Sequence, residues 1–392
     1  MPRMSVRTRG IVLVPLAVML IAACTPPMPP DVLAARAESQ IVCAPGSLEI
    51  GVAETFAGSM SAVGDALTSI CPDQTIVEVT SEQSAPLALV DRTPTPADIT
   101  SFGTANCAAG QTIVVPAFGY PVSMAYNVPG LEGLVMTPEA VAGILSGTVT
   151  SWEDPILAEA NADFDLSALP PISLMSVESP QGSVEAMTTW TSQLAPDAWS
   201  AGTVGTLEAG QKFPSVTDLI GELTIIEGAI AVLPIFQAQN NVLAVANLPV
   251  IVIAEDGTDT EVVVTSDDVQ LYKVGSGATT ITTDDRGNIL ASPAIGGVPI
   301  EGNFDIASSK IVLGEDQAFI GWPVLGYGHL LICDDPAEVL PLSFAQYVVR
   351  LAGQGSLETF GLTPMPEPIR VQTFIPLKVT VSTGDSSATP SS

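Results

Sequence analysis

Positive charge is scarce in this chain. Only 12 of its 392 residues are Lys or Arg, against 42 Asp and Glu, and the formal net charge is −30. Such a chain repels the phosphate backbone of nucleic acid and the headgroups of anionic lipids. We therefore expect no nucleic-acid partner. Hydrophobic residues make up 47% of the sequence, which predicts a folded core rather than a disordered acidic chain.

The residues of most catalytic and metal sites are also scarce. The one histidine, His329, lies in the run GYGHLLI and is interpreted as a packed core residue. A single histidine excludes most Ser-His and Cys-His nucleophile chemistry, and the five cysteines lack zinc-type spacing. The sequence has no G-x-S-x-G motif and no P-loop. We therefore predict that the protein is not an enzyme and needs no metal or cofactor.

One long apolar run is present, near the start of the sequence. Three Arg in residues 1–10 precede unbroken apolar residues at 11–23, a pattern typical of a signal peptide and too short for a membrane span. The run ends in Ile21-Ala22-Ala23-Cys24, which resembles a bacterial lipobox. We predict a signal peptide over 1–23, lipidation of Cys24 and an extended, proline-rich tether over 24–43. An ordinary secretory signal with an incidental cysteine is the alternative.

The rest of the sequence predicts alternating strands and helices. This rhythm is expected of an α/β protein. From 246 to 316 the pattern changes to alternating Val, Ile and Thr, with Asp-Gly at an expected hairpin turn. We expect strands at 48–53, 75–81, 98–102, 112–118 and 121–128, helices at 59–70, 137–147, 185–194 and 336–353, and a disordered tail over 376–392.

The stretch SPQGSV at 179–184 stands just ahead of the helix predicted at 185–194. Small residues with a glycine at a helix start leave backbone N–H groups unpaired, which favours an anion. No Lys or Arg is near in sequence; the nearest are Arg92 and Lys212. The charge that would balance an anion therefore has to come from elsewhere in the fold.

Residues 120–161 resemble the periplasmic phosphate-binding proteins of ABC transporters. That family has a strand ending in YN-hydrophobic-PG, then a helix, then I-x-x-G-x-(I/V)-T-x-W-(N/E)-D-P. Shorter pieces agree in order: GVAETF at 51–56, GAIAV at 228–232 and GLTPMP at 361–366. The matching residues are Tyr126, Asn127, Pro129, Gly130, Ile144, Gly147, Thr148, Val149, Thr150, Trp152, Glu153, Asp154 and Pro155.

This resemblance implies a type II periplasmic-binding-protein fold. Two α/β lobes are joined by two crossover strands, and the ligand lies between the lobes. Lobe I would take 44–119 plus 318–375, and lobe II would take 120–317, with 246–316 as a divergent, β-rich elaboration. The crossings, near Phe118–Tyr120 and Phe319–Trp322, would form the hinge.

The resemblance also implies a ligand site. Thr55 and Phe56 match the family's first ligand turn, Ser84 falls in its second loop, and Gly182 and Ser183 keep the Gly-Ser pair of its phosphate loop. The family's Arg falls on Ser179 or Pro180, and its acid falls near Gly103, so both charges are expected to be missing. Glu178 and Glu185 flank the loop and oppose an anion. Candidates for a replacement cation, by rarity alone, are Arg92, Arg286 and Lys310.

Four cysteines remain after Cys24, and an even number outside the membrane predicts two disulfides with three possible pairings. In the implied fold, Cys43 precedes the first strand and Cys71 ends the first helix. Cys107 follows the third strand of lobe I, and Cys333 follows the returning strand. We therefore predict the pairs Cys43–Cys71 and Cys107–Cys333.

Two functions follow from these patterns. The first is a lipid-anchored binding protein on the extracytoplasmic face of the cell membrane. It would capture inorganic phosphate or another small anion for an ABC permease. The second is an envelope surface protein that kept this scaffold, lost phosphate binding and serves interaction or another ligand.

The anchor prediction is tested at the N-terminus of the mature protein. Replacing Cys24 by Ser should release the protein into the medium or leave it uncleaved, because the lipid is the only expected attachment. Mass spectrometry of the wild-type protein should find a diacylglyceryl Cys24 at the terminus. An unmodified terminus at any other residue would contradict the prediction.

Overall fold

A computed structural model describes residues 38, 40–80, 85–108, 111–253, 259–265, 279–293, 303–305, 310–312, 322–335, 339–365 and 367–379. The predicted signal peptide, Cys24, most of the tether and Ser84 lie outside these residues. Among the helices described, none combines the length and apolar character that a membrane crossing requires. The described residues also hold no group of His, Cys, Asp and Glu that could bind a metal ion.

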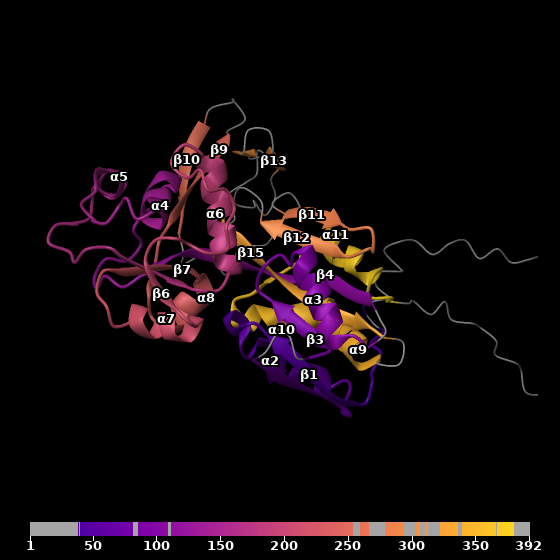
Figure 1. Cartoon of the computed structure of the whole chain (residues 1–392). Helices are drawn as coiled ribbons and strands as arrows, with labels where there is room; N and C mark the ends of the chain where they lie inside the picture. Colours follow the sequence, from indigo (N-terminus) through magenta and orange to yellow (C-terminus); the bar gives the residue numbers. More distant parts are fainter. Residues whose placement is uncertain are drawn as a thin grey trace, which may run out of the picture.

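The first lobe is built on short parallel strands. Strand β1 (Gly46–Val52) lies between β2 (Gln74–Val79) and β3 (Leu87–Val90) and pairs in parallel with both. Helices α2 (Ser59–Thr68) and α3 (Pro96–Asn106) follow β1 and β3, and α9 (Val339–Val348) and α10 (Leu351–Leu357) return to this lobe from the C-terminal part of the chain. Figure 1 shows these helices around β1 and β3.

Strand β4 (Gln111–Tyr126) joins the two lobes and is buried along nearly all of its length. It pairs antiparallel with β15 (Leu325–Asp334) as far as Pro121, and with β7 (Ala229–Pro234) from Val122 onwards. The two strands predicted at 112–118 and 121–128 are therefore parts of one continuous strand. Near the second predicted crossing, the indole Nε1 of Trp322 donates to the carbonyl of Val122 at 2.7 Å. Phe319 lies outside the described residues.

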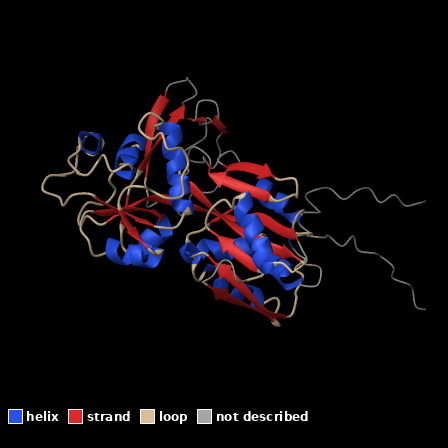
Figure 2. Cartoon of the chain, viewed as in Figure 1, coloured by secondary structure: helices blue, strands red, loops and turns tan. Residues whose placement is uncertain are grey.

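The second lobe repeats the parallel arrangement. Strand β5 (Ser173–Val177) lies between β6 (Gln211–Phe213) and β7 and pairs in parallel with both. The complete sheet runs β2-β1-β3-β15-β4-β7-β5-β6, with β8 (Ala244–Val245) and β16 (Thr363–Pro364) added beside β4. Helices surround it in both lobes (Figure 2). Those of the second lobe are α4 (Pro138–Leu145), α5 (Pro155–Ala158), α6 (Gly182–Leu194), α7 (Val216–Leu223) and α8 (Ile235–Asn240).

The β-rich region forms two separate pieces. Strands β9 (Leu248–Ile253), β10 (Asp259–Val264), β13 (Asn303–Asp305) and β14 (Lys310–Val312) make a small sheet. Strands β11 (Thr279–Thr283) and β12 (Ile289–Pro293) make an antiparallel hairpin that packs on β4 and β15 and also contacts α6. The backbone N–H of Ala291 donates to Nε2 of buried His329 at 3.0 Å. The expectation placed all of 246–316 with lobe II, whereas this hairpin packs on the strands at the junction.

One element was predicted wrongly. The strand expected at 98–102 is part of helix α3, and the third strand of the lobe is β3. Thr95 caps the helix by accepting the N–H of Asp98, whose carboxylate accepts the N–H of Thr95 in return. Pro96 then stands in the first helical turn, where its missing N–H costs nothing. These start signals outweigh the β-branched residues that follow.

Both predicted disulfides are present. Cys43–Cys71 closes a loop with a sequence separation of 28, and Cys107–Cys333 closes one with a separation of 226. The second bond joins the end of α3 to β15, so that the loop it closes contains the whole second lobe.

The two disulfides should contribute unequally to stability. A cross-link stabilises by restricting the unfolded chain, and the effect grows with loop length, typically about 2–4 kcal/mol. We expect Cys107→Ser/Cys333→Ser to lower the free energy of unfolding more than Cys43→Ser/Cys71→Ser does. Guanidinium denaturation of both double variants under non-reducing conditions measures this. An equal or smaller loss for Cys107→Ser/Cys333→Ser would contradict it.

Candidate ligand-binding site between the lobes

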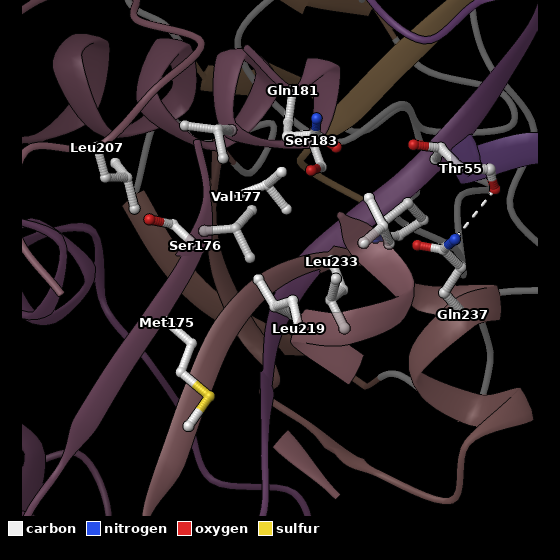
Figure 3. A pocket seen from close by; sticks show the side chains of 14 residues that line it. Thr55, Met175, Ser176, Val177, Gln181, Ser183, Leu207, Leu219, Leu233 and Gln237 are labelled. Atoms are coloured by element: carbon white, nitrogen blue, oxygen red, sulfur yellow. Dashed lines mark hydrogen bonds between the residues drawn. The ribbon is translucent and has the colours of Figure 1, made fainter. Parts of the chain in front are cut away.

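Three loops at the carboxyl ends of parallel strands meet between the lobes. The short 3-10 turn η1 (Glu54–Phe56) follows β1, residues 91–95 follow β3, and the N-terminus of α6 follows β5. Loops at this edge of a sheet are where α/β proteins place ligand-facing groups. Figure 3 shows Thr55 on one side of this region and Gln181 and Ser183 on the other.

Asp91 links the two lobes. Its side chain is buried, and its carboxylate Oδ2 accepts the hydroxyl of Thr55 at 2.9 Å. The backbone N–H of Gly182, in the first turn of α6, lies near this carboxylate. Burial raises the pKa of this carboxyl, against the lowering effect of Thr55 and Gly182. A carboxylate therefore occupies the position at the helix start where the sequence predicts an anion.

Gly182 approaches the first lobe more closely than any side chain would allow. A Cβ atom built on it would collide with the carbonyl oxygen of Asp91 and with the hydroxyl of Tyr120. Tyr120 is fully buried in β4, and its hydroxyl donates to that same carbonyl. The glycine is thus required by the close approach of the two backbones.

The charge beside Asp91 comes from the next residue. Arg92 donates through Nη1 and Nη2 to the two carboxylate oxygens of Asp98, at 2.8 and 2.9 Å. The hydrogen bond from Arg92 lowers the pKa of Asp98 to about 2. Arg92 also attracts Glu185, in the first turn of α6. Arg92 therefore places one positive charge at the junction of the lobes, near the carboxylates of Asp91, Asp98 and Glu185.

Glu185 belongs to the second lobe and reaches back to the first. Its carboxylate lies near the backbone N–H of Thr93. Burial raises its pKa to about 7, while the charge of Arg92 acts in the opposite direction. A glutamate that titrates near neutral pH at this junction makes the contact sensitive to pH.

Glu54 makes another connection between the lobes. Its carboxylate accepts the backbone N–H groups of Val216 and Thr217, both at 2.9 Å, and also the hydroxyl of Thr217. These are the first residues of α7, so a first-lobe acid caps a second-lobe helix. Beside it, Nε2 of Gln237 donates to the carbonyl of Thr55 at 3.1 Å.

The space left between these groups is small. A cavity of about 10 Å³ is lined by Thr55, Ser176, Ser183 and Gln237 together with apolar side chains of the second lobe. This is room for about one water molecule. On the far side of Ser176, Nζ of Lys212 donates to the serine Oγ at 2.9 Å. The lobes are therefore in contact, and a phosphate would not fit without their separation.

The structure brings together part of the predicted site. Thr55 and Ser183 line the cavity, and Gly182 contacts Asp91 beside it. The ring of Phe56 packs instead edge-on against Phe118 and Tyr120, at 4.9 and 5.2 Å between ring centroids. Ser84 lies outside the described residues.

Of the three candidate cations, Arg92 alone is found at this junction among the described side chains. Arg286 lies in the exposed turn that joins β11 to β12. Lys310 belongs to β14, and its side chain is not among those described. All three had been selected by rarity alone, and only the fold distinguishes them.

The position near Gly103, where the family's acid falls and was expected to be missing, does not lie at the junction of the lobes. Gly103 lies within α3, with Thr112 beside it, and no strand ends there. Asp91 directly follows β3 and faces Thr55 and α6, so it is a buried acid at this edge of the sheet. The signal for it was the short apolar run LALV at 87–90, followed at once by Asp-Arg.

The comparison with protein families agrees with this geometry. Residues 43–286 match the model of a PBP superfamily domain. The chain belongs to the PBP superfamily. No curated protein matches its sequence.

Solved structures show the same fold for this PBP superfamily chain. A high-affinity periplasmic phosphate-binding protein bound with phosphate aligns at a TM-score of 0.57 and 15% identity, covering 84% of this chain and 93% of that one. An ancestral soluble variant of the human phosphate-binding protein aligns at 0.54 and 15%, with coverage of 84% and 93%. At this identity the likeness establishes the two-lobed α/β fold, as the sequence implied. The ligand has to be inferred from the residues of the site.

Glu185 should make stability depend on pH. Its folded pKa of about 7 lies above the ordinary value of 4.5, so its contribution to stability is complete below about pH 4.5 and is lost as the pH rises through 7. Glu185→Gln mimics the protonated form. Because one unit of pKa corresponds to about 1.4 kcal/mol, we expect this variant to be more stable at pH 8 by about 1–3 kcal/mol.

Urea unfolding at pH 5 and pH 8 measures this difference, with the exposed Glu208→Gln as the matched control. The gap between the two pH values should shrink for Glu185→Gln and persist for Glu208→Gln. An equal pH dependence in both variants would mean that Glu185 is solvated.

Proposed function

We propose that this protein is an extracytoplasmic binding protein that captures hydrogen phosphate between its lobes for an ABC importer. One observation carries the proposal: the Gly182-Ser183 start of α6 faces Thr55 and Asp91 across the junction of the lobes. Backbone N–H groups from one lobe, with a hydroxyl and an acceptor from the other, suit a small oxyanion that still carries a proton. The resemblance of 120–161 to the phosphate-binding proteins of ABC transporters supports the same ligand and partner.

Asp91 is the group that would select phosphate over sulfate. A buried carboxylate accepts hydrogen bonds and repels a fully ionised oxyanion. Hydrogen phosphate has a hydroxyl to donate to it, whereas sulfate has none at neutral pH. The ligand would replace Gly182 as a donor to Asp91 when the lobes separate to admit it.

Arg92 is the best-placed replacement for the Arg that is missing from 179–184. A guanidinium has five N–H donors, and Asp98 takes two of those on Arg92. The remaining donors can reach an anion that enters beside Asp91. Lys212, held behind Ser176, adds a second positive charge on the opposite lobe.

The alternative function is an envelope protein that kept the scaffold and does not bind phosphate. The observation in its favour is the size of the cavity, about 10 Å³, together with the acids that fill the junction. In that case the closed lobes would present a fixed surface to a partner.

Calorimetric titration with phosphate and with sulfate tests the proposed function. We expect phosphate to bind and sulfate to bind at least about 100-fold more weakly, because sulfate leaves the Asp91 carboxylate without a donor. Gly182→Asp should abolish binding, since it adds a charge and a side chain at the point of closest approach. Arg92→Gln should weaken binding by about 10- to 100-fold through loss of charged hydrogen bonds.

Two further variants sharpen the test. Arg286→Gln removes an equal charge in the exposed hairpin turn and should leave binding unchanged. Ser179→Arg restores a cation to the loop and should strengthen binding by about 1.5–3 kcal/mol, less the repulsion from Glu178 and Glu185. Undetectable phosphate binding by both wild type and Ser179→Arg would favour the alternative function.

A further inference from the structure

Three carboxylates reach from one lobe to backbone N–H groups of the other. The carboxylate of Glu54 accepts the backbone N–H groups of Val216 and Thr217 at the start of α7. Asp91 packs against Gly182 at the start of α6, and the carboxylate of Glu185 lies near the backbone N–H of Thr93 in the first lobe. We call Glu54, Asp91 and Glu185 the carboxylate latch.

The latch uses the chemistry that an external anion would use. The first N–H groups of a helix have no partner within the helix, and a negative charge there is favourable. The starts of α6 and α7 both face the first lobe: Glu54 accepts the first N–H groups of α7, and Asp91 lies beside the first turn of α6. The start of α8 also contacts the first lobe, where Nε2 of Gln237 donates to the carbonyl of Thr55. The places where an anion could draw the lobes together are therefore occupied by the chain itself.

Packing at the junction agrees with this reading. Gly182 has no room for a Cβ against Asp91 and Tyr120, and the remaining cavity of about 10 Å³ holds no oxyanion. The η1 turn is also held from the second lobe by Gln237. The hairpin β11–β12 lies against both the junction strands and α6, and the hydroxyl of Thr93 donates to the carbonyl of Ala291 at 3.0 Å.

We propose that the carboxylate latch holds the two lobes closed in the absence of any ligand, so that a ligand enters only after these contacts open. Closure in a two-lobed binding protein is ordinarily coupled to the ligand, which supplies contacts to both lobes. Here the chain supplies those contacts. The inference goes beyond the proposed function and does not depend on phosphate being the ligand.

The latch has a consequence for affinity. When only the open form can bind, the apparent dissociation constant is the intrinsic one divided by the open fraction. Weakening the latch should therefore tighten the binding of any ligand that enters the junction. Loss of the charged hydrogen bonds of Glu54 should raise the open-to-closed ratio by about tenfold or more.

Small-angle X-ray scattering of the purified protein without ligand tests the latch. Glu54 is exposed, so Glu54→Ala removes its carboxylate and leaves the core intact. Glu49→Ala, which removes an exposed acid from β1 of the same lobe, is the matched control. Gly182→Ala forces the backbones apart and provides the reference for separated lobes.

We expect wild type and Glu49→Ala to share one radius of gyration, and Glu54→Ala to shift towards the larger value of Gly182→Ala. Amide hydrogen exchange at Val216 and Thr217 should accelerate in Glu54→Ala alone. Adding phosphate should leave the radius of wild type unchanged.

Two results would overturn the latch. One is a wild-type radius that matches Gly182→Ala and falls when phosphate is added, because the ligand would then be what closes the lobes. The other is a Glu54→Ala variant that scatters and exchanges like Glu49→Ala. Expansion of Glu54→Ala without phosphate binding by any variant would support the latch and contradict phosphate as the ligand.

Discussion

The carboxylate of Asp91 accepts the Thr55 hydroxyl from its own lobe and lies near the Gly182 N–H of the other. Much of the junction depends on this one shared charge. It sets how closely α6 approaches the first lobe, and this distance requires glycine at 182 and leaves the Tyr120 hydroxyl against the same backbone. A buried charge with two good donors is tolerated, whereas the same charge without them would be costly.

Acidic groups outnumber basic groups at this junction, as they do in the whole chain. Arg92 stands near three carboxylates, and two of these, on Asp91 and Glu185, have pKa values raised by burial. The excess of acidic groups lets the chain's own carboxylates occupy the closed junction. The same groups repel a doubly charged anion. A ligand that carries a proton, or enters as the acids become protonated, meets less resistance. The two-lobed scaffold of the PBP superfamily here carries charged groups on both sides of the junction.

Local patterns in the sequence predicted most of the helices and strands named from them, and the family resemblance implied the two lobes. Thr137 and Pro138 predicted the start of α4, and the structure has Thr137 as its N-cap. The positions of the cysteines in the fold implied by the resemblance predicted both disulfides, although the element before Cys107 is helix α3 and not a strand. The strand at 87–90 was missed because four apolar residues give too short a pattern. The third strand was therefore placed at 98–102, and Asp91, which directly follows the true strand, was not recognised as a residue of the site.

The contacts between the lobes had no local signal. Glu54 and Val216 are 162 residues apart in sequence, and neither stands in a motif that names the other. Gly182 was predicted from its loop, but its neighbours Asp91 and Tyr120 could be found only from the packing of the lobes. Phe56 matched the family motif in sequence, yet its ring is used in the core beside Phe118.

A crystal structure of the protein grown without phosphate or sulfate tests the central claim most directly. The account predicts closed lobes, the Asp91 carboxylate within hydrogen-bond distance of the Gly182 nitrogen and the Glu54 carboxylate on the first N–H groups of α7. Open lobes with Asp91 and Glu54 in solvent would contradict it.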